Sequence, residues 1–174
     1  MGVDSNISSF QGRTPVIHDT AFIDASARVV GDVLVGDGVS IWPMAVLRAD
    51  EARTVIGSGS ALLDMSLVES PEGSPTTVGE GSIISHGAII HGARIGSGVL
   101  VGAGAIVLDD VVVGEGSIIA AGTIVTPRTI IPPNSLVLGS PGKVLRQTTF
   151  DEREGTRKQA GGLYRKSRTY LTGE

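Results

Sequence analysis

Two of the three histidines in this chain lie five residues apart, in the stretch SHGAIIHG that contains His86 and His91. Imidazole nitrogens and carboxylate oxygens are common protein ligands of zinc. A spacing of five is not the i, i+4 spacing by which a helix presents two histidines to one metal ion. A carboxylate, Glu69, lies 22 residues before His91. These side chains could therefore share a metal only if the strands of a repeat bring them together.

A period of six residues predicts such strands. The aliphatic positions of the repeat are Ile17, Ile23, Val29, Val35, Ile41, Leu47, Ile56, Leu62, Val68, Val78, Ile84, Ile90, Ile95, Val101, Val107, Val113, Ile119, Val125, Ile131 and Val137. A small or β-branched residue often follows four positions later, and we expect both to point inward. Glycine and aspartate between the strands suit tight turns. Three units make a triangular coil of about 18 residues, and coils stack at roughly 4.8 Å.

Two insertions interrupt the repeat and set the register of the candidate ligands. Three extra residues follow Leu47, and four follow Val68. Glu69 and His91 each directly follow an inward aliphatic residue, and their separation equals one coil plus the four-residue insertion. We therefore expect them to stack side by side on one face of successive coils. His86 lies two places after an inward residue, so we expect it to join them only from another subunit.

Composition narrows the function classes. The 174 residues carry a net charge of −4, which does not favour nucleic acid or an anionic membrane as a partner. Cysteine is absent, so disulfide and thiolate chemistry are excluded. Residues 1–13 contain no apolar run typical of a signal peptide, and the longest apolar runs are too short to span a bilayer. We expect a soluble, cytoplasmic protein.

The end of the chain departs from the repeat. Thr149 and Glu152 have the spacing of a capping box, and charged and apolar residues mix after them. The sequence therefore predicts a β-helix domain over residues 1–147 and a C-terminal helix and tail over 148–174, packed along the prism. Three glycines are expected to weaken this helix: Gly155, Gly161 and Gly162.

Four motifs resemble the γ-class carbonic anhydrases over roughly residues 12–170. They are SIWP (40–43), VLRAD (46–50), SHGAIIHG (85–92) and GSP (139–141). The resemblance implies an all-β, left-handed parallel β-helix of hexapeptide repeats that forms a homotrimer. It also implies zinc sites of three histidines at the subunit interfaces. His91 matches a ligand that shares a subunit with the first histidine, and His86 matches the ligand donated across the interface. Arg48 and Asp50 match charges that form an ion pair between subunits.

The chain departs from this family pattern at the site itself. The first zinc histidine is replaced by Glu69, a glutamine that hydrogen-bonds the zinc-bound water by Leu63, and an asparagine by Ala61. Asp64 is retained, and Glu51 matches an acidic residue used for proton transfer, so these two are the candidate catalytic residues. The resemblance implies a Glu69, His86 and His91 site for zinc, with iron, cobalt or no metal as alternatives. We expect hydration of carbon dioxide to bicarbonate to be weak or lost, because Glu69 adds a negative charge.

Two other functions compete with this one. Hexapeptide β-helices also include acyl transferases that use an acyl-coenzyme A. Those enzymes usually carry a long loop with a catalytic histidine, whereas the insertions here are three and four residues, and cations are few in the coils over 113–137. The second alternative is a non-catalytic trimeric scaffold, in which Arg48 and Glu69 form an ion pair and the histidines serve packing. Under that hypothesis, Glu51 and Glu72 are solvated loop charges.

Overall fold

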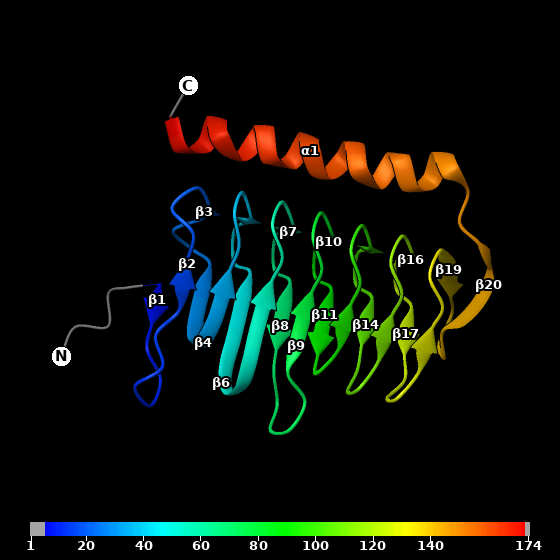
Figure 1. Cartoon of the computed structure of the whole chain (residues 1–174), viewed down its shortest axis with the longest axis horizontal. Helices are drawn as coiled ribbons and strands as arrows, with labels where there is room; N and C mark the ends of the chain where they lie inside the picture. The colour runs from blue at the N-terminus through cyan, green and yellow to red at the C-terminus, as the bar shows by residue number, and fades with distance from the viewer. Residues whose placement is uncertain (1–5, 173–174) are drawn as a thin grey trace.

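The computed structural model describes residues 6–172, which form a left-handed parallel β-helix with one α-helix lying along it (Figure 1). The fold predicted from the six-residue period is confirmed. The coils stack in chain order from the N-terminal end, and the helix runs back along the stack toward the first coils (Figure 1). Neighbouring coils are joined by parallel strand pairs, as in β10 with β13, where Ile84 is in register with Val101.

Two sheets build the faces of the prism within residues 6–172. One has twelve strands: β1 (Ile7–Ser8), β2 (Val16–Ile17), β4 (Arg28–Val35), β6 (Val46–Ile56), β8 (Leu67–Glu69), β9 (Thr76–Val78), β11 (Ile89–His91), β12 (Arg94–Ile95), β14 (Ile106–Val107), β15 (Val112–Val113), β17 (Ile124–Val125) and β18 (Ile130–Ile131). The other has eight: β3 (Phe22–Ile23), β5 (Ser40–Ile41), β7 (Ala61–Leu62), β10 (Ile83–Ile84), β13 (Leu100–Val101), β16 (Ile118–Ile119), β19 (Ser135–Leu138) and β20 (Lys143–Gln147).

The long strand β6 joins two faces of the prism. Its first residues pair with β8, where Arg48 is in register with Glu69. Its last residues pair with β9, where Thr54 is in register with Thr76. The three-residue insertion thus extends one strand through the edge between two faces, and the polar end of β8 lies beside that edge.

The interior of the prism is filled by the predicted aliphatic series. Every predicted position from Val29 to Val137 is buried in one continuous cluster, and Ile17 and Ile23 of the first coil are partly buried against it. Each coil leaves its apolar edge for the next coil to cover. Stacking therefore stabilises the fold, as in other solenoids.

The helix α1 (Phe150–Thr172) follows β20 after a short connection. The capping box is confirmed: the Thr149 backbone N–H donates to the Glu152 carboxylate at 2.7 Å, and the Glu152 N–H donates to Thr149 Oγ1 at 3.2 Å. The expected weakening near Gly155, Gly161 and Gly162 is wrong, because α1 is continuous through all three. Packing offsets the low helix propensity of glycine, roughly 1 kcal/mol for each, since one face of α1 is buried on the eight-stranded sheet.

Residues 1–5 and 173–174 of the predicted domain ranges lie outside the described residues. Within the described part, strand structure ends at Gln147 and helical structure begins at Phe150. Of the helices in residues 6–172, none is long and apolar enough to cross a membrane.

Candidate functional site

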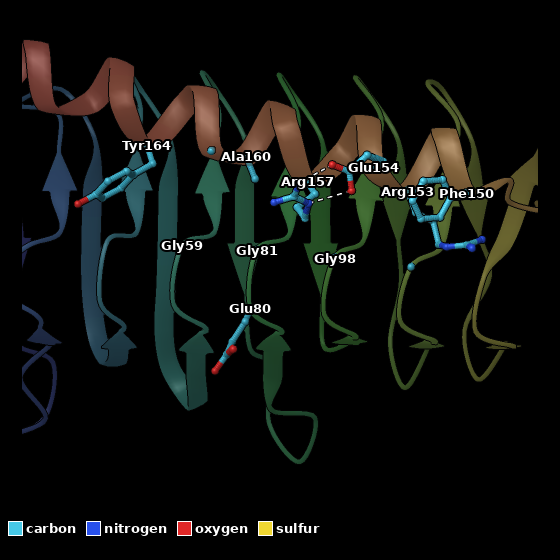
Figure 2. Close-up of a pocket in the computed structure, with 12 residues that line it drawn as sticks. Gly59, Glu80, Gly81, Gly98, Phe150, Arg153, Glu154, Arg157, Ala160 and Tyr164 are labelled. Atoms are coloured by element: carbon cyan, nitrogen blue, oxygen red, sulfur yellow. Dashed lines mark hydrogen bonds and ion pairs between the residues drawn. The ribbon is translucent and has the colours of Figure 1, made fainter.

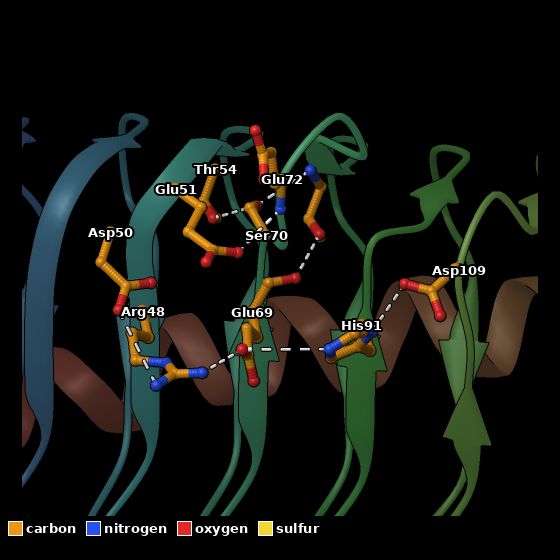
Figure 3. A network of polar contacts seen from close by, with 10 residues as sticks. Arg48, Asp50, Glu51, Thr54, Glu69, Ser70, Glu72, His91 and Asp109 are labelled. Carbon is orange, nitrogen blue, oxygen red and sulfur yellow. Dashed lines mark hydrogen bonds and ion pairs between the residues drawn. The ribbon is translucent and has the colours of Figure 1, made fainter.

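A row of charged side chains crosses one face of the β-helix at the ends of successive strands (Figure 3). Arg48 on β6 is in register with Glu69 on β8, and Glu69 is in register with His91 on β11. The predicted stacking of Glu69 against His91 is thereby confirmed. Strand pairing fixes these positions, because each residue follows an inward aliphatic side chain and so points out of the prism.

Glu69 lies between a cation and an imidazole. Its Oε1 atom accepts a hydrogen bond from Arg48 Nη2 and lies 3.9 Å from His91 Nε2. Arg48 Nη1 also lies 3.7 Å from Asp50 Oδ2, so one guanidinium faces two carboxylates. The Glu69 side chain is 16% exposed and that of His91 is 31% exposed. The hydrogen bond with Glu69 raises the pKa of Arg48, with further contributions from the charges of Glu69, Asp50 and Glu51.

Asp109 completes the row beyond His91. Its Oδ1 atom lies 2.8 Å from His91 Nδ1 (Figure 3). An ionised carboxylate only accepts, so Nδ1 carries the proton of the neutral ring and Nε2 presents its lone pair toward Glu69. Sequence reasoning missed Asp109, although it lies 18 residues after His91, one uninterrupted coil. The same register argument that paired Glu69 with His91 would have found it.

His86 and Asp64 form a separate pair on a different edge of the prism. His86 Nδ1 lies 3.1 Å from Asp64 Oδ2, and both side chains are exposed to solvent. Among residues 6–172, no three His, Cys, Asp or Glu side chains of one chain come together as a metal-binding group. A single chain therefore brings Glu69 and His91 together but does not bring His86 to them.

Leu63 and Ala61 lie on the eight-stranded side of the prism. Both are buried in a second apolar cluster with Trp42 and Ile83, and Ala160 of α1 packs on the same cluster. Their side chains offer no hydrogen bond to a ligand. The position at which the family pattern has a polar glutamine is here part of the surface to which α1 is bound.

The two insertions are tied together by Glu51. Its Oε2 atom accepts from the Glu72 backbone N–H at 2.8 Å, and its own carbonyl accepts from Arg13 Nη1 at 3.0 Å. A cavity of about 300 Å³ lies here, lined by Phe10, Gln11, Arg13, Asp50, Glu51 and Glu72. Glu51 thus serves to hold the second insertion, while its neighbour Asp50 contacts Arg48.

A larger cavity of about 570 Å³ lies between α1 and the glycine turns of the coils (Figure 2). The turns contribute Gly59, Gly81 and Gly98, and the helix contributes Arg157, paired to Glu154, among others. No predicted site residue lines this cavity. The chemistry-bearing side chains are gathered instead on the face that carries the row.

The donor set of the row fits a metal ion in part. Zinc bonds to imidazole nitrogen and carboxylate oxygen are each about 2.0–2.2 Å long, so an ion can span the 3.9 Å between His91 Nε2 and Glu69 Oε1. Histidine ligands commonly donate their second nitrogen to a carboxylate, as His91 does to Asp109. Arg48 competes for the same Glu69 oxygen. A third donor must come from outside this chain.

The comparisons with known proteins agree with the fold. A family model described as bacterial transferase hexapeptide (six repeats) matches residues 14–49 and 92–127. A crystal structure of a hexapeptide transferase family protein from Anaplasma phagocytophilum is 35% identical, with 96% of this chain and 98% of that chain covered and a TM-score of 0.92. A putative acetyltransferase from Bacillus cereus is 32% identical, with 97% and 98% covered and a TM-score of 0.93.

A curated relative matches over a shorter stretch. The carnitine operon protein CaiE of Escherichia coli O157:H7 is 41% identical over 76 residues, which are 44% of this chain. The match spans only 39% of the length of that relative. The likeness to the two solved structures, in contrast, extends over nearly the whole of each chain.

Proposed function

This chain belongs to the hexapeptide transferase family, and from that premise we propose that it is a γ-carbonic-anhydrase-like homotrimer with a metal site between subunits. Glu69 and His91 of one copy and His86 of the next would hold zinc, iron or cobalt. The reaction would be a slow, reversible hydration of carbon dioxide to bicarbonate. The approach of Glu69 Oε1 to His91 Nε2, with Asp109 on the other ring nitrogen, carries this proposal.

An outward apolar ladder supports the trimer. It runs beside the charged row on the same face and consists of Val46, Leu67, Ile89, Ile106 and Ile124. Each of these side chains is only half-buried in a single chain. A contiguous apolar stripe of this kind favours association, because covering it removes apolar area from water. A second copy on this ladder would also stand next to His91, where the third donor is needed.

The substitutions of this chain predict slow chemistry. A bound zinc ion lowers the pKa of water and supplies a nucleophile near neutral pH. Glu69 opposes that effect, because its carboxylate adds a negative charge where the family has a neutral imidazole. Leu63 offers no hydrogen bond to orient a reactant. Asp109 fixes the ring of His91, and Asp64 contacts His86, so both histidines have a carboxylate partner.

Metal content and hydration rate test this function. We expect close to one metal ion per subunit after loading with zinc, and carbon dioxide hydration well below that of Glu69→His in a stopped-flow assay. Glu69→His should raise the rate by roughly 10- to 100-fold if the surrounding site is intact. Absence of stoichiometric metal from the loaded wild type would refute the metal site. With no turnover of any substrate either, the scaffold alternative would hold.

Acyl transfer is the second candidate, favoured by the two full-length relatives. One is called a hexapeptide transferase family protein and the other a putative acetyltransferase. His91, oriented by Asp109, has the arrangement of a general base that accepts a proton from an acceptor hydroxyl or amine. A thermal-shift comparison of zinc, acetyl-coenzyme A and buffer separates the candidates. Stabilisation by acetyl-coenzyme A but not by zinc would favour acyl transfer.

A further inference from the structure

We propose that Arg48 is an internal cation that competes with the metal ion for Glu69 and so sets the metal affinity of the site. This inference rests on the proposed metal site. Its starting point is that a single oxygen faces both groups: Glu69 Oε1 accepts from Arg48 Nη2, and the same atom lies 3.9 Å from His91 Nε2 (Figure 3). An ion between His91 and Glu69 must share or displace that hydrogen bond.

Charge and coordination both make Arg48 a competitor. A guanidinium engages the oxygen lone pairs of a carboxylate and neutralises its charge, and both are what a metal ion takes from a carboxylate ligand. A histidine at position 69 would attract no guanidinium. The competition is therefore a consequence of Glu69 itself, and it belongs to this chain rather than to a site of three histidines.

Arg48 has a second position that it can take. Its Nη1 atom lies 3.7 Å from Asp50 Oδ2, two residues along the same strand, and its side chain is about half exposed. An ion pair this exposed contributes little net stability, so exchanging Glu69 for Asp50 is inexpensive. Asp50 thus receives the guanidinium when a metal ion takes Glu69, and no charge is left without a partner.

His91 lacks such a competitor. Its Nδ1 atom is held by Asp109 at 2.8 Å, which leaves Nε2 facing Glu69. The two ligands of this chain therefore differ: His91 is prepared for a metal ion, whereas Glu69 must first be released. Changes at Arg48 should act on the affinity for the ion and leave the orientation of His91 unchanged.

The test is calorimetric titration of zinc chloride into the metal-free full-length protein, with cobalt(II) absorption as a second readout of the ligand set. We expect Arg48→Gln to tighten zinc binding by about 3- to 10-fold, since an exposed ion pair contributes at most a few-fold. Arg48→Lys, which keeps the charge but loses the planar fork, should lie between wild type and Arg48→Gln. Asp50→Asn should weaken binding, because Arg48 then has only Glu69.

A matched control lies on the same strand. Arg53 pairs with Asp32 at 3.0 Å, on the other part of β6, so Arg53→Gln removes an arginine charge without touching Glu69. Zinc affinity in Arg53→Gln should equal that of wild type. If Arg48→Gln does not assemble, the comparison of Arg48→Lys with wild type decides the question.

The outcomes separate this inference from the proposed function. If wild type binds zinc and Arg48→Gln and Arg48→Lys bind it no more tightly, the competition is refuted while the metal site stands. If Arg48→Gln binds zinc where wild type does not, the competition is supported in its strongest form. If wild type and all variants fail to bind zinc, the metal site itself is refuted and the competition with it.

Discussion

Asp109 Oδ1 lies 2.8 Å from His91 Nδ1, one uninterrupted coil further along the chain. The contact links two levels of the molecule. The six-residue period places Asp109 beyond the end of β14 and His91 at the end of β11, and the stacking of coils brings the two side chains together. The side chain of Asp109 thereby decides which nitrogen of His91 faces Glu69.

Replacement of Asp109 should therefore impair metal binding without unfolding the protein. We expect Asp109→Asn to weaken zinc binding by about 10- to 100-fold, because an amide accepts the His91 proton less strongly and no longer fixes the ring. Calorimetric titration of the metal-free protein measures this. Asp110→Asn is the matched control, since Asp110 bonds Ser74 rather than His91. Equal affinities in the two variants would show that Asp109 has no role in binding.

The register of the site could be predicted because insertions in a solenoid can be counted. Glu69 and His91 were paired from a coil of 18 residues and a four-residue insertion, and strand pairing confirms this. The same count reaches Asp109. The in-chain contact of Arg48 with Glu69 follows from a coil plus the three-residue insertion, and it corresponds to the ion pair of the scaffold alternative.

The surroundings of the site could not be predicted in the same way. The position of α1 on the prism depends on tertiary packing, which a six-residue period does not encode. Leu63 was therefore considered only as a lost polar residue, although it is buried in the apolar cluster beneath the helix. The continuity of α1 through its glycines has the same origin, because burial outweighs local propensity.

The apolar ladder beside the row should mediate association between copies. Ile89 lies at its centre, paired with Leu67 and Ile106 on the neighbouring coils. Ile89→Asp should convert the oligomer to a monomer, because it buries an unpaired charge in the contact. Light scattering coupled to size-exclusion chromatography measures the mass. Ile130→Asp, on an exposed position of β18 on another face, should leave the mass unchanged. Dissociation in both variants or in neither would refute the assignment of this face.

The first turn of α1 should respond to acid through Glu152. Hydrogen bonds from Arg146 and from the Thr149 backbone lower the pKa of Glu152 to about 2. A depressed pKa in the folded state stabilises the protein above the ordinary glutamate value of 4.5, and this contribution is lost as the pH falls toward 2.

Glu152→Gln should therefore melt below wild type at pH 7, and the difference should shrink steadily between pH 4.5 and pH 2. Thermal melts followed by circular dichroism across this range give the comparison. Asp151→Asn, in the same turn, is the control and should show a smaller difference at pH 7. A Glu152→Gln difference that stays constant down to pH 2 would contradict the assigned role.

Gly31 fixes the approach of β4 to the strand that carries Arg48. Its φ is +84°, and a Cβ atom there would lie 2.1 Å from the carbonyl oxygen of Ala49. Gly31→Ala should therefore lower the free energy of unfolding by about 3 kcal/mol or more, from backbone strain and overpacking together. Gly59→Ala, at φ +68° with open space around its Cβ, carries only the strain and should lose about 1 kcal/mol. Urea unfolding followed by the fluorescence of the single tryptophan, Trp42, compares the two. Equal losses would show that the contact with Ala49 does not constrain this strand.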